Sequence, residues 1–314
     1  MGDHLVKITI LLAAYQGEKY LPAQLESLSC QTEPHFQVLF QDDGSTDRTP
    51  QILGDWAEKD ARFHAACEQG RHFGAIGNFF SLLRQSDGDL ILFCDQDDIW
   101  EPEKLALLLR AYQEASASDP DVPILVHSDA SIIDENGLMI APSFFRLEGW
   151  DPQAVHLNQL LVQNNATGCM MLLNRPLADL VLRYGDPSRM FMHDWFIALT
   201  AAAFGRVVFL NRPLTKYRLH SANVIGASRS SLLRRGLNAL GNRKAARGRI
   251  ALTYTHAEAF REAYGDLLPS AAARIVDDYL STQRLSKLNR ILSVYRLGCL
   301  MQSPVTRLGQ ILFG

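Results

Sequence analysis

Three aspartates within four positions, Asp95, Asp97 and Asp98, follow the apolar run Leu90–Cys94. A short apolar run bounded by polar residues is typical of a buried strand, so the aspartates would lie at its carboxyl end. Carboxylates this close repel one another unless a cation or a bound ligand offsets their charge. Asp95 and Asp97 are two positions apart, and an ideal strand would point both to one face. This spacing suits one divalent ion that also holds a phosphate, although it also occurs in solvated acidic turns.

A second acidic turn, Asp42-Asp43-Gly44-Ser45, follows the short apolar segment at 37–40. Its carboxylates could accept hydrogen bonds from a base or a ribose hydroxyl, and Gly44 permits close approach of a ligand. The other interpretation is an ordinary turn before a helix, with Ser45 or Thr46 as the N-cap. Because ligands of open α/β sheets bind at the carboxyl ends of the strands, two acidic strand ends favour one shared crevice.

Strand-like and helix-like segments alternate through the first 130 residues. Apolar runs predict strands at 6–14, 37–40 and 90–94, and amphipathic spacing predicts helices at 20–30, 78–85 and 102–115 and around Ile52–Trp56. Further on we expect strands at 124–126 and 207–210, a helix at 192–203 and helical structure beyond Ser230. This alternation predicts an α/β fold, with a mostly parallel sheet that helices flank on both faces.

The composition is that of a soluble globular protein, with 47% hydrophobic and 21% charged residues among 314. There is no run of 18 uncharged apolar residues that would span a membrane. The first four residues lack the basic start of a signal peptide, and the five cysteines contain no Cys-x-x-Cys pair. We therefore expect a cytoplasmic protein with reduced cysteines.

The charge is unevenly divided along the chain. Residues 229–314 hold 14 Lys and Arg against 5 Asp and Glu, whereas residues 1–228 hold 17 against 29. The basic residues of the C-terminal part alternate with leucines at roughly helical spacing, as in helices that lie peripherally on the inner face of a cell membrane. The alternative is a set of helices packed on the rest of the protein with a solvated basic face. No nucleic-acid-binding motif is present, so we expect no nucleic acid partner.

Several motifs, in order along residues 6–227, resemble those of family 2 glycosyltransferases. They are Ile10–Gly17, Asp42–Thr49, Gly77–Phe79, Phe93–Trp100 with Pro102 and Lys104, Thr167–Cys169, His193–Trp195, Tyr217–His220 and Asn223–Gly226. The form Asp95-Gln96-Asp97-Asp98-Ile99-Trp100 is similar to the rhamnosyltransferase-like branch. The resemblance implies the GT-A fold, in which a nucleotide-binding α/β half merges with an acceptor-binding half. We expect these halves at about 1–115 and 116–228, within a catalytic domain 1–228, and a basic helical region at 229–314.

The resemblance also implies roles for individual residues. Contacts to the nucleotide sugar would come from Ala13, Tyr15, Asp42, Asp43, Asp95 and Arg218. Asp97 would bind Mg²⁺ or Mn²⁺, which neutralises the departing diphosphate, and His220 would complete the metal's ligands or contact the diphosphate. Asp98 has no assigned role and is expected to support the loop.

Asp194 matches the family's catalytic base, which takes the proton of the acceptor hydroxyl during an inverting displacement. A helix N-terminus would lower its pKa and burial would raise it, and the sequence leaves the balance open. His193 stands where many relatives carry a second acid, and its role is undefined. Without the family context, His193-Asp194 would be an ordinary helix start.

The resemblance implies an inverting, metal-dependent transfer of L-rhamnose from dTDP-L-rhamnose to a surface polysaccharide or a lipid-linked oligosaccharide. Donors with a UDP-linked hexose stay open, as does a catalytically silent module that binds a sugar nucleotide or glycan. A phosphohydrolase with Asp95 as nucleophile would leave the turn Asp42–Ser45 unexplained. A dinucleotide-dependent oxidoreductase would need a Gly-x-Gly-x-x-Gly after the first strand, which is absent.

Overall fold

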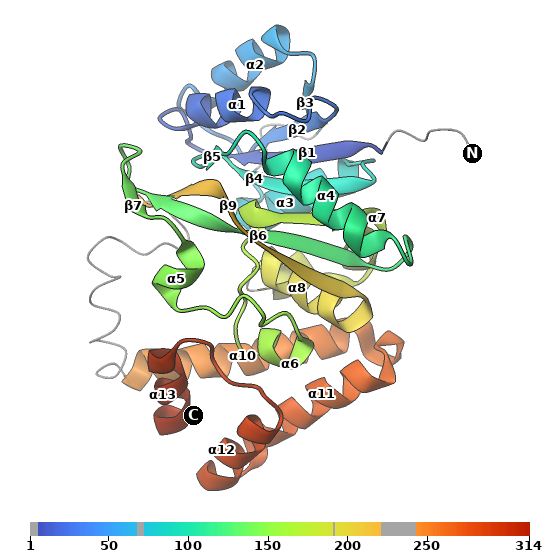
Figure 1. The fold of residues 1–314 in the computed structure, drawn as a ribbon, viewed down its shortest axis with the longest axis vertical. Helices are drawn as coiled ribbons and strands as arrows, with labels where there is room; N and C mark the ends of the chain where they lie inside the picture. Colours follow the sequence, from blue (N-terminus) through green and yellow to red (C-terminus); the bar gives the residue numbers. More distant parts are fainter. Residues whose placement is uncertain (1–5, 68–71, 191, 221–242) are drawn as a thin grey trace.

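The computed structural model describes residues 6–67, 72–190, 192–220 and 243–314. Its strands are β1 Ile8–Ala14, β2 Gln37–Asp42, β3 Phe63–Ala65, β4 Leu90–Asp95, β5 Ile99–Trp100, β6 Ile124–Ile133, β7 Met139–Ala141, β8 Met171–Asn174 and β9 Arg206–Arg218. Within the described residues they form one nine-stranded sheet in the order β3-β2-β1-β4-β8-β6-β9-β5, with β7 paired to β6 (Figure 1). Strands β1 to β4 pair in parallel, as do β6 and β9, whereas β8 is antiparallel to both neighbours.

Helices cover both faces of this sheet, which confirms the predicted fold class. They are α1 Leu21–Ser29, α2 Thr49–Lys59, α3 Gly74–Gln85, α4 Lys104–Ser116, α5 Phe144–Glu148, α6 Leu157–Leu160, α7 Arg175–Tyr184 and α8 His193–Phe204. Side chains alternate along each strand between the two faces. Ile10 and Leu92 belong to the core under α1, α2 and α4, whereas Leu11 and Phe93 belong to the core under α3, α7 and α8.

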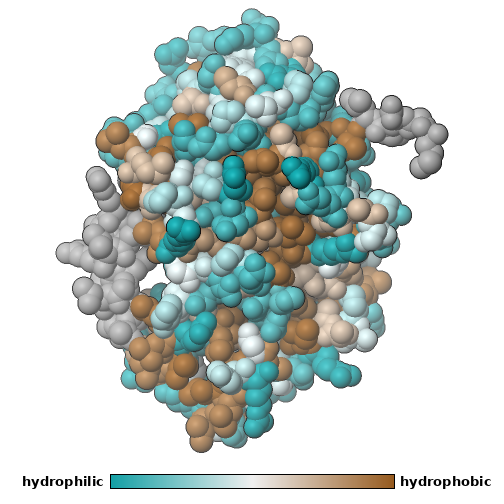
Figure 2. All heavy atoms as spheres, viewed as in Figure 1, coloured by the Kyte–Doolittle hydropathy of each residue, from teal (hydrophilic) through white to brown (hydrophobic). Residues whose placement is uncertain are grey.

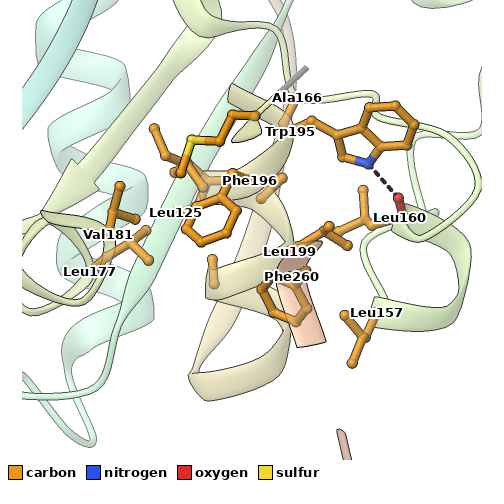
Figure 3. Packing of buried hydrophobic residues seen from close by; sticks show 14 of the residues in the cluster. Leu125, Leu157, Leu160, Ala166, Leu177, Val181, Trp195, Phe196, Leu199 and Phe260 are labelled. Carbon is orange, nitrogen blue, oxygen red and sulfur yellow. Dashed lines mark hydrogen bonds between the residues drawn. The ribbon is translucent and has the colours of Figure 1, made fainter. Parts of the chain in front are cut away.

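Helix α8 lies at the centre of the second core (Figure 3). Phe196 points toward Leu177 and Val181 of α7, whereas Trp195 points the other way. The indole Nε1–H of Trp195 donates to the carbonyl of Leu160 at 2.6 Å. Apolar packing on several sides therefore fixes the start of α8, where His193 and Asp194 lie.

The C-terminal helices lie at the end of the molecule opposite α1 and α2 (Figure 1). They are α10 Arg243–Tyr264, α11 Ser270–Ser281, α12 Lys287–Arg296 and α13 Pro304–Phe313. Phe260 of α10 and Val276 of α11 belong to the same core as α8. The predicted domain boundary at 228–229, and the motif at 223–226, lie outside the described residues. In the part of the chain that is described, no helix is long and apolar enough to cross a membrane.

Three predicted details are wrong. Strand β6, predicted at 124–126, continues to Ile133. Strand β9 extends to Arg218, beyond the predicted 207–210, because it continues to pair with β6 after a register shift opposite Pro213. Proline cannot donate to a ladder, and irregular positions of a sheet tolerate it. Neither Ser45 nor Thr46 caps α2. Instead Asp47 Oδ1 accepts the N–H of Thr49 at 3.0 Å.

Candidate active site

The carboxyl ends of β1 and β4 are joined by one side chain, Gln96. Its Oε1 accepts the N–H of Tyr15 at 2.8 Å, and its Nε2 donates to the carbonyl of Tyr15 at 2.7 Å. A Cβ on Gly17 would lie 2.1 Å from Gln96 Oε1, so any larger residue there would push the Gln96 amide out of its place. The loop after β1 is thus held against the acidic turn after β4.

The same loop is tied to the turn after β2. The N–H of Gln16 donates to Ser45 Oγ at 2.8 Å, and the N–H of Gly17 donates to Thr49 Oγ1 at 2.7 Å. Gln16 is held at a φ of 50°, a conformation that side chains seldom adopt. Across the sheet, Ala13 pairs with Asp95 and Ala14 pairs with Asp42. Three strand ends therefore meet at one edge of the sheet.

Asp42 and Asp43 are buried and hold the backbone around them. Asp42 Oδ2 accepts the N–H groups of Gly44 and Ser45 at 3.1 and 2.9 Å. The Asp43 carboxylate accepts the N–H groups of Phe73 and Gly74 at 2.5 and 2.9 Å, at the N-terminus of α3. A carboxylate at a helix N-terminus is stabilised by the helix dipole. Each carboxylate thus already has partners that fix its position at this edge.

Two aromatic rings stand at this edge. Tyr15 is 47% exposed, and its ring centroid lies 5.2 Å from that of His72. His72 Nδ1 lies 3.0 Å from Asp43 Oδ2. An exposed ring next to buried carboxylates offers both a stacking surface and hydrogen-bond acceptors, as a nucleoside requires.

Strand β4 ends at Asp95, and Gln96 and Asp97 form a turn. The expectation that strand geometry points Asp95 and Asp97 to one face is therefore wrong, because the strand does not continue to Asp97. Asp97 instead meets the end of β9: Nε2 of His220 lies 2.6 Å from Asp97 Oδ2. The structure thus brings the two predicted metal ligands into contact.

Arg218 is hydrogen-bonded to this turn. Its Nε–H donates to the carbonyl of Asp97 at 2.7 Å, and its backbone N–H donates to Asp98 Oδ1 at 3.0 Å. Its guanidinium also lies 4.8 Å from the ring centroid of Tyr20. Arg218 is 5% exposed, so much of its donor capacity is used inside the protein. Asp98 supports the loop through this contact, as expected.

Asp95 and Asp98 form the buried floor of the site together with Cys169. One ligand atom from each lies within 4.8 Å of the others. Asp98 Oδ2 has no hydrogen-bond partner. Burial, then the charge of Asp97, raises the pKa of Asp98 to about 7 and that of Asp95 well above its usual range. Burial likewise raises the pKa of the Cys169 thiol, which stays protonated and makes a poor ligand for a hard cation.

Lys104 balances part of this negative charge, a role that the sequence patterns did not predict. Its fully buried Nζ donates to the carbonyl of Cys169 at 2.5 Å and to Thr215 Oγ1 at 2.8 Å, and lies 3.6 Å from the Trp100 ring centroid. Burial lowers its pKa to about 8. One signal was available, since Lys104 precedes Leu108 by one helical turn and so shares its buried face.

Asp194 lies in the first turn of α8 and is 5% exposed. Its Oδ2 accepts the N–H of Gly168 at 3.1 Å, and its Oδ1 has no hydrogen-bond partner. Burial raises the pKa of Asp194 to about 6, against the backbone N–H groups of Gly168 and Trp195. Burial therefore outweighs the helix N-terminus, the balance that the sequence left open.

The neighbouring residue, His193, has a neutral ring that is packed among apolar side chains. Its ring centroid lies 4.7 Å from that of Phe79 and 5.2 Å from that of Phe93, and neither ring nitrogen has a hydrogen-bond partner. Burial lowers its pKa to about 4. A Cβ on Gly168 would lie 3.0 Å from His193 Nε2, so these two residues pack closely.

The carboxylates of Asp95, Asp97, Asp98 and Asp194 share one region, because the last three all raise the pKa of Asp95. A divalent cation fits this set, since Mg²⁺ and Mn²⁺ prefer carboxylate oxygens and one buried oxygen, Asp98 Oδ2, lacks a partner. The arrangement can hold a cation with a phosphate at Asp97 and accept a proton at Asp194.

Comparisons with known proteins agree with this geometry. The model of the family described as Glycosyl transferase family 2 matches residues 9–181. The dTDP-rhamnosyl transferase RfbG of Shigella flexneri is 25% identical over 227 residues, which cover 69% of this chain and 74% of that protein. The UDP-Glc:alpha-D-GlcNAc-diphosphoundecaprenol beta-1,3-glucosyltransferase WfgD of Escherichia coli is 27% identical over 247 residues, which cover 77% and 87%. Other curated relatives are longer, and the chain spans 60 to 66% of their length.

Among solved structures, S. aureus TarS in complex with UDP-GlcNAc has a TM-score of 0.56. It is 17% identical and covers 97% of this chain and 86% of that chain. At this identity the likeness shows the fold alone, and that fold is of the predicted GT-A type. Since the family model matches more than half of the chain, and its matched region carries the acidic turns after β2 and β4, the chain belongs to glycosyltransferase family 2.

Proposed function

We propose that this protein is an inverting, metal-dependent glycosyltransferase that transfers L-rhamnose from dTDP-L-rhamnose. The observation that carries the proposal is Asp194, a buried carboxylate with one unpartnered oxygen and a pKa of about 6. Such a group is mostly ionised at neutral pH yet basic enough to accept a proton. It lies close enough to the acidic turn after β4 to perturb Asp95.

The reaction needs two separate functions at this edge. As the acceptor oxygen bonds to the anomeric carbon, the bond from that carbon to the β-phosphate oxygen breaks, and the acceptor's hydroxyl proton passes to Asp194. Attack from the face opposite the diphosphate inverts the anomeric centre. A bound Mg²⁺ or Mn²⁺ would neutralise charge on the departing diphosphate.

The remaining residues bind and orient the donor. We propose that Ala13, Tyr15, Asp42 and Asp43 contact the nucleoside, and that Asp95 contacts the ribose and diphosphate. Asp97 and His220, which already lie 2.6 Å apart, would hold the metal. Arg218 is proposed to contact the diphosphate and to hold the Asp97–Asp98 turn, through the hydrogen bonds that it makes there.

The proposed acceptor is a surface polysaccharide or a lipid-linked oligosaccharide, formed in the cytoplasm or at the inner face of the membrane. The relative WfgD is named for a diphosphoundecaprenol-linked acceptor, which supports the lipid-linked alternative. The proposed domain division, 1–228 catalytic and 229–314 helical, would leave the whole donor site in the first part.

The second candidate is a glycosyltransferase with a UDP-hexose donor. It is favoured by WfgD, named for UDP-Glc, and by the complex of TarS with UDP-GlcNAc. The donor dTDP-rhamnose is favoured by RfbG. A thermal-shift screen of dTDP-rhamnose, UDP-glucose and UDP-GlcNAc, with and without MnCl₂, separates the candidates.

A stabilisation that requires both dTDP-rhamnose and Mn²⁺, and that Asp97→Asn abolishes, is the expected result. A larger shift with a uridine-linked sugar would replace the donor. A shift with glycan alone, in the absence of any nucleotide sugar, would indicate a binding module and contradict the proposal.

A further inference from the structure

Helix α12 exposes a row of large apolar side chains. Leu288, Leu292 and Tyr295 are 68%, 47% and 72% exposed. Their spacing of four and three residues places them on one helix face. The other face packs inward, where Ile291 and Val294 line a small space shared with α10, α11 and α13. The helix is thus already anchored through its inner face, and its outer apolar face has no partner in the described residues.

Helix α13, which meets one end of α12, also exposes apolar side chains. Leu308 and Leu312 are 42% and 43% exposed. Lys287 Nζ donates to the carbonyl of Leu312 at 2.6 Å, which places the start of α12 beside the end of α13. Figure 2 shows hydrophobic side chains gathered at this end of the molecule. We call the five exposed side chains of the two helices the α12–α13 face: Leu288, Leu292, Tyr295, Leu308 and Leu312.

The part of the sequence that carries this face contains basic residues and no acidic ones. Residues 279–314 contain Arg284, Lys287, Arg290, Arg296 and Arg307, and no Asp or Glu. Arg290 and Arg307 donate to backbone carbonyls of their own region. Arg284, Lys287 and Arg296 are exposed at the two ends of α12.

We propose that the α12–α13 face binds the surface of an anionic phospholipid bilayer. Exposed leucines and a tyrosine would enter the boundary between headgroups and acyl chains, while the exposed cations meet lipid phosphates. A second copy of this chain fits less well, because a symmetric contact would bring two sets of like charges together.

The structure also divides the basic C-terminal region in two. Helices α10 and α11 bury Phe260, Tyr264 and Val276 in the core with α8, as expected of helices packed on the rest of the protein. Among the C-terminal helices, α12 and α13 present the apolar face. The bilayer contact is independent of the donor chemistry, and it rests on the proposed function only in that a lipid-linked acceptor gives it a use.

Co-sedimentation of the full chain with vesicles tests the proposal. We expect binding to mixed phosphatidylglycerol–phosphatidylcholine vesicles and much weaker binding to phosphatidylcholine alone. Leu288→Ser should weaken binding by about tenfold, since one inserted leucine is lost. Leu267→Ser, at a leucine 57% exposed between α10 and α11, should leave it unchanged. Arg284→Glu with Arg296→Glu should abolish the preference for phosphatidylglycerol.

Absence of binding to the mixed vesicles would overturn the proposal, as would equal losses in Leu288→Ser and Leu267→Ser. A concentration-dependent dimer in light scattering that Leu288→Ser dissociates would assign the face to a second copy instead. Donor-dependent thermal shifts use another part of the molecule, so failure of the bilayer contact and failure of the proposed function are separate results.

Discussion

The side-chain amide of Gln96 forms two hydrogen bonds with the backbone of one residue, Tyr15, 81 positions away in the chain. This pair joins the acidic turn after β4 to the exposed aromatic ring after β1. A donor that spans both elements depends on their spacing, so Gln96 positions the site without contacting the reacting atoms.

Gln96→Ala should therefore raise the KM for the donor about tenfold, with a smaller change in kcat. The reason is that the loop after β1 loses its two hydrogen bonds to the turn after β4. Steady-state kinetics measure this, with the exposed Gln113→Ala as the matched control. Gly17→Ala should have a similar effect, since its Cβ would displace the Gln96 amide. Unchanged donor KM in both variants would contradict a positioning role.

Lys104→Met should lower the free energy of unfolding by about 3 kcal/mol or more, because it leaves buried carboxylates without their nearby cation and removes a hydrogen bond from the Cys169 carbonyl. Urea unfolding measures the change. Lys244→Met, at an exposed position of α10, is the control and should fall within about 0.5 kcal/mol of the unmodified protein. Equal stability of the two variants would show that Lys104 does not offset the floor charge.

The rate of transfer should depend on ionisation of Asp194. Because burial raises its pKa to about 6, the carboxylate is protonated and inactive as a base below that pH. A profile of kcat/KM against pH reports the groups of the free enzyme, and it should fall about tenfold per pH unit on the acid side, with an apparent pKa of about 6. An acid limb near the ordinary pKa of an aspartate, about 4, would show that Asp194 is not the base.

The raised pKa also means that Asp194, when it is ionised, lowers the free energy of unfolding. Above a pH of about 6 the folded protein carries a buried charge that the unfolded chain hydrates freely. Below about pH 4 the group is protonated in both states and the cost is gone. Asp194→Asn should thus be more stable at about pH 8, by at most about 3 kcal/mol, and equal to the unmodified protein below about pH 4. Lower stability of the variant at the higher pH would contradict this account.

Local sequence patterns predicted the elements that depend on short-range order. The strands β4 and β1 are largely buried on both faces, and uninterrupted apolar residues are what such strands require. The predicted run at 6–14 starts two residues too early, because β1 begins at Ile8. The start of α8 and the acidic turns after β2 and β4 follow from the same patterns. The fold class and the shared carboxylate edge can therefore be predicted from features that lie close together along the chain.

Contacts between residues that are far apart in the chain cannot be predicted from such local patterns. The pairing of Gln96 with Tyr15 and the burial of Lys104 beneath the carboxylates depend on how separate elements pack. The length of β9 depends on its neighbour β6, which carries it past Pro213. The pKa of Asp194 was undecided for the same reason, since the depth of its burial is a property of the tertiary structure.

The proposed function assigns separate roles to Asp97, which would hold the metal and the donor, and to Asp194, which would accept the proton. It is tested most directly by measuring donor binding with Mn²⁺ by calorimetry and turnover in parallel for Asp97→Asn and Asp194→Asn. We predict that Asp97→Asn weakens donor binding by about tenfold or more. Asp194→Asn should bind the donor as the unmodified protein does and show no transfer. Transfer by Asp194→Asn at the unmodified rate, or loss of donor binding in that variant, would contradict the account.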